Sequence, residues 1–397
     1  MSYSYRTRTF KQGSGPNRGN RKSYNNYRKN SKTIDPARFI AAAKEQTENV
    51  YVPQHTFADF PLNALLHNNL KAKGYTIPTP IQDQTIKSGI EGRDIIGMAG
   101  TGTGKTAAFA LPVLDKLLSS RDNAAIIIAP TRELAQQIEV ECEALAAGSR
   151  LRGALLIGGS SMGAQLRDLR QNPSIVIGTP GRIKDHLQRG SLRLDKFNLV
   201  VLDEVDRMLD MGFVHDVREI LSHTSEQKQT FFFSATMDNR VRDLITGFSS
   251  DPVVITIASN RASENVHQDV VRYDSNDRLS KLHDILLQDN VTKAIVFDET
   301  QRSVERLSRS LFERGFSVDA IHGGKSQGQR QRALHKFKNN EISILVATDV
   351  AARGIDVADI THVINYSTPK EYEDYIHRVG RAGRAGQTGY AYTFVAR

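Results

Sequence analysis

Short runs of apolar residues alternate with longer amphipathic segments along most of this chain. In the first half, the apolar runs are Asp94–Met98, Ala125–Ala129, Ala154–Ile157, Ile175–Gly178, Leu199–Asp203 and Thr230–Ser234. Runs of this kind, apolar at nearly every position, are typical of parallel strands buried on both faces, and helical segments lie between them. The pattern therefore predicts an α/β layered domain, in which ligands bind at the carboxyl ends of the strands.

The alternation pauses near Ala258–Glu264 and then begins again. In the second half, the runs are Val266–Tyr273, Ala294–Phe297, Val318–Ile321, Ile344–Thr348, His362–Asn365 and Tyr390–Val395. They predict a second α/β domain after a short polar linker. The predicted division of the chain is a tail at 1–34, a short helix and connector at 35–52, a first domain at 53–258, a linker at 259–266 and a second domain at 267–397.

A short helix is expected just before the first domain. Asp35 and Pro36 form a typical helix start, with an N-cap followed by proline at the first helical position. Phe39, Ile40 and Ala43 would share one side of this helix. We expect it to end near residue 49 and to pack on the first domain.

The most informative stretch follows the first strand, where the sequence reads AGTGTGKT over Ala99–Thr106. Gly102 and Gly104 let backbone N–H groups close around phosphate oxygens, and the helix that follows adds the positive end of its dipole. Lys105 would reach the terminal phosphates, and the Thr106 hydroxyl would join a Mg²⁺ shell. The stretch predicts a nucleotide phosphate-binding loop. The second half has no such loop, so we expect no separate nucleotide site there.

The fifth strand ends in Asp203-Glu204-Val205-Asp206. A carboxylate at a strand end beside a phosphate loop can hold Mg²⁺, often through water, which predicts that role for Asp203. Glu204 can orient or deprotonate an attacking water molecule. With the phosphate loop upstream, this run predicts a hydrolytic nucleotide site.

Composition narrows the class of protein. The chain has 397 residues, with 39% hydrophobic and 24% charged residues, which suits a globular protein of two domains. No apolar run approaches the roughly 18 residues that a membrane-spanning helix needs. Cys142 is the only cysteine, which excludes an intrachain disulfide and a cysteine metal cluster and agrees with a reducing cytoplasm.

The positive charge is concentrated in the tail. Residues 1–34 contain nine Lys and Arg residues and no Asp or Glu, and these equal the net charge of +9 for the whole chain. Tyrosines and Phe10 are spaced among them. A segment so poor in apolar surface is expected to be disordered, and basic and aromatic residues in this arrangement suit single-stranded nucleic acid.

Two other interpretations of the tail stay open. It could be a solubilising tail without a partner, or an organelle transit peptide, which is also rich in Arg and Ser and poor in acid. Gly13, Gly15, Pro16 and Gly19 would break an amphipathic helix, which counts against a transit peptide.

Taken together, the motifs resemble those of the DEAD-box RNA helicases over about Phe57–Arg397. In chain order they read GYTIPTPIQ (74–82), AGTGTGKT (99–106), PTRELA (130–135), GG (158–159), TPGR (179–182), DEVD (203–206), SAT (234–236), IVFDET (295–300), QGQR (327–330), ATDVAARGID (347–356) and HRVGRAGR (377–384). The resemblance implies two tandem RecA-like domains with parallel sheets, a Q motif at 55–83 and an ATP-binding helicase domain at about 86–257.

The resemblance also assigns a nucleotide site. It implies that Gln82 reads the adenine edge, since an amide that both donates and accepts can distinguish adenine from guanine, and that Phe57 stacks near the base. Arg381 and Arg384 would be arginine fingers, and Ser234 and Thr236 would couple nucleotide state to RNA. The remaining nucleotide contacts it implies are Ala99, Gly100, Thr101, Gly102, Thr103, Gly104, Lys105, Thr106, Asp356, His377 and Arg378.

For RNA, the resemblance implies contacts to the backbone and 2′-OH groups, which give little sequence preference. The positions are Thr131, Arg132, Glu133, Gly158, Gly159, Thr179, Arg182, Gln327, Arg330, Thr348 and Gly354. Three residues depart from the family pattern: Gly100 replaces a glutamine, Thr103 a serine and Val205 an alanine. Gly100 leaves nucleotide affinity in question, and Val205 alters packing without removing a chemical group.

The expected activity is therefore ATP-dependent local unwinding and release of RNA duplexes by a cytoplasmic monomer that uses ATP and Mg²⁺. Two alternatives stay open. A DNA helicase of the same superfamily is disfavoured by PTRELA, TPGR and Gln82. An ATP-dependent RNA clamp that serves as an assembly platform would use the same residues, so only strand displacement separates it from a helicase.

Overall fold

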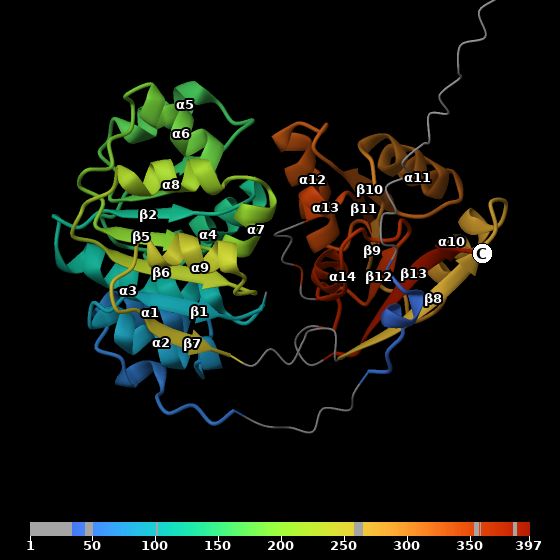
Figure 1. The fold of residues 1–397 in the computed structure, drawn as a ribbon, viewed down its shortest axis with the longest axis horizontal. Helices are drawn as coiled ribbons and strands as arrows, with labels where there is room; N and C mark the ends of the chain where they lie inside the picture. The colour runs from blue at the N-terminus through green and yellow to red at the C-terminus, as the bar shows by residue number, and fades with distance from the viewer. Residues whose placement is uncertain are drawn as a thin grey trace, which may run out of the picture. The chain divides into compact units, whose positions relative to one another are not determined.

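Two parallel β-sheets form the framework of the protein in a computed structural model, which describes residues 34–43, 51–100, 102–257, 265–352, 357, 359–383 and 387–397 (Figure 1). We call residues 51–257 the N-lobe and the described residues from 265 to 397 the C-lobe. The expected α/β fold with two parallel sheets is confirmed. The predicted tail, apart from Ile34, and most of the predicted linker lie outside the described residues.

The N-lobe sheet has seven parallel strands in the order β3-β4-β2-β5-β6-β1-β7. They are β1 (Ile95–Met98), β2 (Ala125–Ile128), β3 (Gly153–Leu156), β4 (Ile175–Gly178), β5 (Leu199–Leu202), β6 (Gln229–Ser234) and β7 (Val253–Thr256). Successive residues of β2 pack into different clusters, with Ile127 on one face and Ile126 on the other. The sheet is therefore buried on both faces, as its apolar runs predicted.

Helices cover both faces of this sheet. Those whose apolar residues pack with Ile127 are α1 (Ala64–Ala72), α2 (Pro80–Ile90), α3 (Lys105–Ser119) and α4 (Arg132–Leu145). Those that pack with Ile126 are α5 (Met162–Leu169), α6 (Pro180–Gln188), α7 (Val205–Asp210), α8 (Val214–Ser222) and α9 (Asn239–Thr246). A short 3₁₀ helix, η2 (Phe57–Asp59), precedes α1.

The C-lobe sheet has six parallel strands in the order β10-β11-β9-β12-β13-β8. They are β8 (Val266–Tyr273), β9 (Ala294–Phe297), β10 (Val318–Ile321), β11 (Ile344–Ala347), β12 (His362–Asn365) and β13 (Gly389–Ala396). The helices are α10 (Arg278–Leu286) and α11 (Gln301–Glu313) on one face and α12 (Gln327–Lys338), α13 (Asp349–Ala352) and α14 (Tyr372–Val379) on the other. Every strand predicted for this half is present.

The structure adds one strand that the pattern did not predict. β7 pairs with β1 at the edge of the N-lobe sheet. Val254 is 60% exposed, and of the four residues in β7 only Ile255 is fully buried. An edge strand covered on one side lacks the continuous burial by which the other strands were recognised.

The segment before the N-lobe corrects two expectations. Its described residues, 34–43, form a single 3₁₀ turn, η1 (Pro36–Phe39), capped by the Asp35 side chain, and they pack on the C-lobe rather than on the first domain. The expected helix end near residue 49 lies outside the described residues. Ala41 and Gln268 of β8 exchange two backbone hydrogen bonds of 3.0 and 2.7 Å. Because β8 is an edge strand, its unpaired backbone groups offer this segment partners.

Aromatic contacts hold the same segment, which we call the docked segment (residues 34–43). The Phe39 side chain is fully buried, and its ring centroid lies 4.7 Å from that of Tyr375. The Arg38 guanidinium lies 3.9 Å from the centre of the Tyr372 ring. The docked segment is thus part of the C-lobe core, although the N-lobe follows it in the chain.

The docked segment gives a direct prediction about stability. Phe39→Ala should destabilise the packing of this segment by about 3 to 5 kcal/mol, because removal of a fully buried ring leaves a cavity that the site can only partly close. Amide hydrogen exchange at Ala41 and Gln268, which donate to each other across the bridge, should then be faster. The matched control is Ile40→Ala, at a neighbouring side chain that is 59% exposed. Equal protection of both amides in the two variants would contradict the assigned role of Phe39.

Candidate nucleotide and RNA sites

The predicted phosphate loop connects β1 to α3. Gly102 and Gly104 have φ values of +79° and +89°, a region that favours glycine, and Gly104 is the N-cap of α3. Lys105 begins the helix and is buried, and its Nζ donates to the Ala99 carbonyl oxygen at 3.2 Å. The Thr103 hydroxyl donates to the Gly100 carbonyl oxygen, and Thr106 follows in the first turn. Thr101 lies outside the described residues.

Asp203 and Glu204 follow β5 at the same edge of the sheet. The Lys105 ammonium lies 3.7 Å from an Asp203 oxygen, and both groups are buried. Burial raises the pKa of Asp203 to about 6, although the positive charge of Lys105 opposes this shift. The negative charge of Glu204 adds to this rise, so the pKa values of the two neighbouring carboxyl groups are shifted in opposite directions.

Glu204 has the opposite pKa shift. Burial acts to raise its pKa, but the charges of Arg207, Lys105, Arg381 and His377 outweigh burial and lower it. Arg207 donates to the Glu204 carboxylate at 3.0 Å. Glu204 also has a φ of +53°, an uncommon value for a residue with a side chain. An ionised carboxylate held in a strained backbone at a strand end is suited to orienting water.

The last acidic residue of this run joins two predicted motifs. Asp206 accepts hydrogen bonds of 3.1 Å from the backbone N–H groups of Ala235 and Thr236, and one of 3.2 Å from the Thr236 hydroxyl. The Ser234 hydroxyl donates to the Thr236 carbonyl oxygen. The loop after β6 is therefore bonded directly to the helix after Glu204. No role was predicted for Asp206 or Arg207 from the sequence, although the spacing of Glu204 and Arg207 suits a helical ion pair.

The two residues expected near the base lie in different settings. Gln82 is at the third position of α2, where its oxygen accepts the Thr79 N–H at 2.9 Å. Its amide group donates to the Gly104 carbonyl oxygen at 3.1 Å, so Gln82 contacts the phosphate loop. Phe57 is 6% exposed and packs edge-on against Tyr75, with ring centroids 5.6 Å apart.

The RNA-binding residues predicted in the N-lobe follow β2, β3 and β4. The Arg132 guanidinium packs over Gly158 and Gly159, where an added Cβ would lie 2.7 and 2.5 Å from its nitrogens. Thr131 caps α4 through its hydroxyl, Thr179 is the N-cap of α6, and Arg182 lies in the first turn of α6. The structure therefore brings these residues to the same edge of the sheet as the phosphate loop.

In the C-lobe, Gln327 and Arg330 begin α12, and Thr348 follows β11. Arg330 lies 2.7 Å from the Glu133 carboxylate, and the Gln327 amide is 3.1 Å from the Gln136 oxygen. Predicted RNA-binding residues of the two halves thus contact each other. Gly354, Asp356 and Arg384 lie outside the described residues.

Three residues of α14 and the turn after it, His377, Arg378 and Arg381, make different contacts. Arg378 binds Asp349 of its own lobe with two hydrogen bonds of 2.6 and 2.7 Å and also donates to Asn365. His377 Nδ1 lies 2.8 Å from the Arg207 guanidinium. Arg381 is buried, and its charge acts on Glu204. The structure therefore uses Arg378 within the C-lobe and brings His377 and Arg381 toward the carboxylates.

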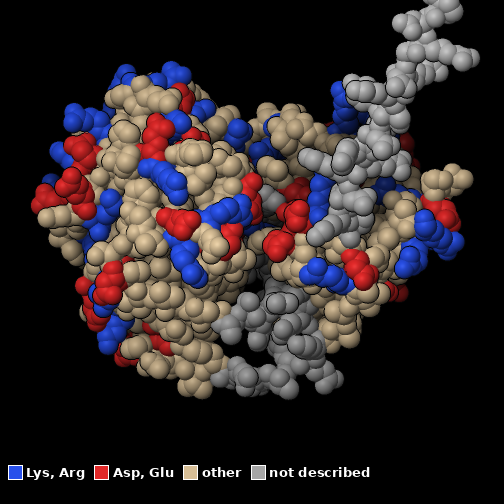
Figure 2. All heavy atoms as spheres, in the orientation of Figure 1, with Lys and Arg blue, Asp and Glu red and all other residues tan. Residues whose placement is uncertain are grey.

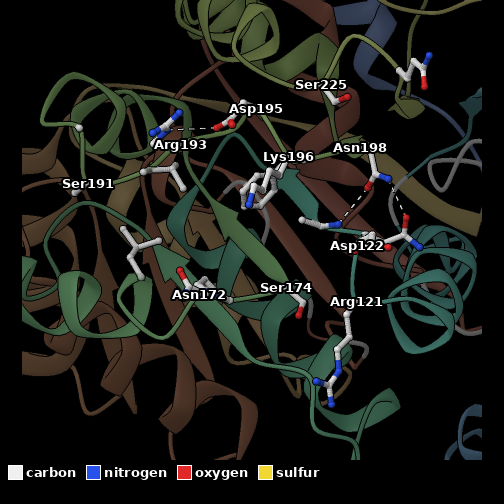
Figure 3. Close-up of a pocket in the computed structure, with 18 residues that line it drawn as sticks. Arg121, Asp122, Asn172, Ser174, Ser191, Arg193, Asp195, Lys196, Asn198 and Ser225 are labelled. Carbon is white, nitrogen blue, oxygen red and sulfur yellow. Dashed lines mark hydrogen bonds and ion pairs between the residues drawn. The ribbon is translucent and has the colours of Figure 1, made fainter.

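A hollow of about 1020 Å³ lies elsewhere on the N-lobe (Figure 3). It is lined by residues that precede β2, β4 and β5, so it lies at the opposite edge of the N-lobe sheet from the phosphate loop. Figure 3 shows Arg193 and Asp195 paired there. Its lining mixes both charges and contains none of the predicted site residues. No described helix has the length and apolarity needed to cross a membrane.

Comparison with known proteins gives consistent matches over both halves. A family model described as DEAD/DEAH box helicase matches residues 79–244, and one described as helicase conserved C-terminal domain matches residues 277–386. The ATP-dependent RNA helicase CshA of Limosilactobacillus reuteri is 44% identical over 344 residues, which cover 85% of this chain and 69% of that protein. The DEAD-box ATP-dependent RNA helicase CshA of Bacillus subtilis is 42% identical, covering 86% and 69%.

Solved structures with a similar fold include two proteins bound to RNA. A structure of S. cerevisiae Dbp5 bound to RNA and ADP BeF3 has a TM-score of 0.76 and 27% sequence identity, over 86% of this chain and 90% of that one. A structure of Mss116p bound to ssRNA and AMP-PNP has a TM-score of 0.75 and 30% identity, over 85% and 73%. These likenesses show that the two parallel-sheet lobes are RecA-like domains.

The raised pKa of Asp203 predicts how stability depends on pH. The Asp203 carboxyl group binds a proton more tightly in the folded protein than in the unfolded chain. The free energy of unfolding therefore falls as pH rises from about 4 to about 6. Asp203→Asn, which has no charge to bury, should therefore be more stable than the wild type at pH 7 by about 1 to 3 kcal/mol, and this gain should shrink below pH 6. Thermal melting at pH 4.5 and 7 measures the difference. The exposed Asp195→Asn is the control, and an equal gain at both pH values would contradict the prediction.

Proposed function

This chain belongs to the DEAD-box family of ATP-dependent RNA helicases, and from that premise we propose that it hydrolyses ATP at the N-lobe edge to unwind and release short RNA duplexes. The activity is that of the family; the residue roles are our proposal. One observation carries it: a buried Lys105 of the phosphate loop lies 3.7 Å from Asp203, beside an ionised Glu204. Lys105 suits the phosphate charge, Asp203 suits a metal ion and Glu204 suits a water molecule.

The proposed hydrolysis divides the work among these groups. Lys105 binds the terminal phosphates, and the N–H groups of Gly102 and Gly104 surround their oxygens. Glu204, which its lowered pKa keeps ionised, orients the attacking water and accepts its proton. Arg381 and Arg384 from the C-lobe stabilise the charge that develops on the transferring phosphoryl group.

The donor set also fits Mg²⁺. Within the described residues no group of three or more His, Cys, Asp or Glu side chains could enclose a metal ion. Mg²⁺ in nucleotide sites is instead bound through one or two protein oxygens, waters and substrate phosphates. Asp203, buried next to a lysine, and the Thr106 hydroxyl would hold the ion, which when bound neutralises charge on the phosphate oxygens.

Base and RNA recognition use separate surfaces in this proposal. Gln82 and Phe57 select adenine, and Asp356 and His377 complete the nucleotide contacts from the C-lobe, whereas the predicted contact Arg378 is bound to Asp349 within that lobe. RNA is bound by its backbone at the residues predicted in both lobes, with little sequence preference. Asp206, which bonds the loop of Ser234 and Thr236, transmits nucleotide state to that surface.

The basic tail is proposed to increase RNA affinity. Residues 35–397 have no net charge, and on the face of Figure 2 basic and acidic side chains are interspersed over the N-lobe. A surface of this kind attracts RNA only through local contacts, whereas residues 1–34 carry nine positive charges. We further propose that the protein works as a monomer in the cytoplasm.

Glu204→Gln tests the proposed hydrolysis. The amide keeps the size of the side chain but cannot accept a proton, so RNA-stimulated ATP hydrolysis should fall by at least about 100-fold while ATP binding is retained. Lys105→Ala should instead weaken ATP binding itself. Glu226→Gln, at an exposed position, is the matched control.

The same proteins should be assayed for displacement of a short RNA duplex. Unchanged ATP hydrolysis in Glu204→Gln would refute the assigned role. ATP hydrolysis by the wild type without strand displacement would favour the RNA clamp over the helicase, and equal stimulation by DNA would favour a DNA helicase.

Deletion of residues 1–34 tests the tail. For single strands, log affinity falls with log salt concentration by about 0.7 per neutralised phosphate, so nine charges could contribute about 6 to the slope. If about half of these charges contact phosphate at one time, the deletion should flatten the slope by roughly 3. The control replaces all nine Lys and Arg residues by Gln, which removes the charge but keeps the length of the tail. It should flatten the slope as much as the deletion does. ATP hydrolysis at saturating RNA should not change, and superimposable salt curves would refute the proposal.

A further inference from the structure

One buried carboxylate holds the stretch that leads into the N-lobe. Asp83 of α2 has a side chain that is 1% exposed. One of its oxygens accepts the Tyr51 hydroxyl at 2.5 Å and the Gln54 N–H at 2.7 Å, and the other accepts the His55 N–H at 3.1 Å and lies 2.8 Å from His55 Nδ1. Three donors and the His55 ring nitrogen thus converge on a single side chain.

The stretch has little else to fix it. Residues 51–55 belong to no helix or strand, and they make no backbone-to-backbone hydrogen bond within the described part of the chain. Burial acts to raise the pKa of Asp83, but the hydrogen bonds from Tyr51, Gln54 and His55 outweigh it, and the pKa is lowered. The carboxylate is therefore charged, and charged acceptors form the stronger hydrogen bonds.

Asp83 is next to Gln82, and the two side chains reach in different directions from one turn of α2. Gln82 donates to the Gly104 carbonyl oxygen of the phosphate loop, while Asp83 binds the stretch before Phe57. That turn of helix therefore contacts both the phosphate loop and the stretch that precedes Phe57.

A row of rings continues from the bound stretch to Phe57. The His55 ring centroid lies 5.5 Å from that of Phe60, and Phe60 lies 6.3 Å from Phe57. Phe57 in turn packs edge-on against Tyr75. A shift of His55 would therefore be passed to Phe57 through packed rings, since cores of this density transmit displacement.

We propose that Asp83 is a positioning residue for base recognition: it fixes residues 51–55, and through them Phe57, relative to Gln82. This inference rests on the proposed adenine site. Asp83 itself does not touch the nucleotide in this account. It determines how well the base site is formed before ATP binds, so it controls affinity and base preference rather than the chemical step.

Asp83→Asn is the sharpest test, because the change is nearly isosteric. One carboxylate oxygen becomes an NH₂ group that faces N–H or O–H donors and can accept from none of them. We expect the KM for ATP to rise about tenfold and kcat at saturating ATP to stay within about twofold of the wild type. The preference for ATP over GTP in kcat/KM should fall by about fivefold. Tyr51→Phe, which removes one donor, should give a smaller rise in KM.

Asp115→Asn provides the matched control. Asp115 is also a buried aspartate on an N-lobe helix, but it accepts the N–H of Asn63, the N-cap of α1, and no group of residues 51–55. This variant should lose stability but keep the wild-type KM and base preference. If Asp83→Asn lowers the melting temperature without changing KM, or if Asp115→Asn raises KM equally, Asp83 is only a structural residue and the inference is wrong.

The same measurements separate the role of Asp83 from the proposed selection of adenine by Gln82. A wild type that hydrolyses ATP and GTP equally well would show that Gln82 does not select adenine. The KM for ATP would then still decide the role of Asp83: a rise in Asp83→Asn alone supports positioning, and no rise overturns it.

Discussion

The direction of the parallel strands is the constraint on which the rest of the N-lobe depends. Because every strand of the sheet runs the same way, the six segments that follow β1 to β6 all begin at one edge. The phosphate loop, PTRELA, GG, TPGR, DEVD and SAT are those six segments. Motifs spread over more than 130 residues are thereby placed together by topology, and the hydrophobic burial that forms the sheet also assembles the site.

Assembling the site at a buried edge has an electrostatic cost. Lys105, Asp203, Glu204 and Arg207 are all buried there, and a buried charge is tolerated only when it is paired and hydrogen-bonded. The cost is visible in the two carboxylates: the pKa of Asp203 is raised, whereas positive neighbours lower that of Glu204. The site is therefore less stable than an apolar core would be, which is the usual condition of a catalytic site.

Much of this could be predicted because the signals are local. A run of four or five buried residues identifies each inner strand, and GTGTGKT identifies the phosphate loop without any knowledge of tertiary contacts. β7 was missed because an edge strand with Val254 exposed loses that signal. The docked segment was misplaced because its partners, Gln268 and Tyr375, are more than 200 residues away, and no local pattern specifies them. Roles for Asp83 and Asp206 were missed because each binds a segment 29 residues away, which no local pattern specifies either.

Asp83 and Asp206 belong to a wider pattern in the N-lobe. Asp94 accepts the N–H groups of Thr230 and Ser250, and Asp115 accepts that of Asn63, so four buried aspartates each fix a segment distant in sequence. An aspartate on a helix or strand end is short enough to be held rigidly, and its two oxygens can satisfy several backbone donors that the loop leaves unpaired. Segments of the N-lobe that have no regular secondary structure are thus held in fixed positions by these aspartates. Fixed loops are what a site needs when its reacting groups come from six separate segments.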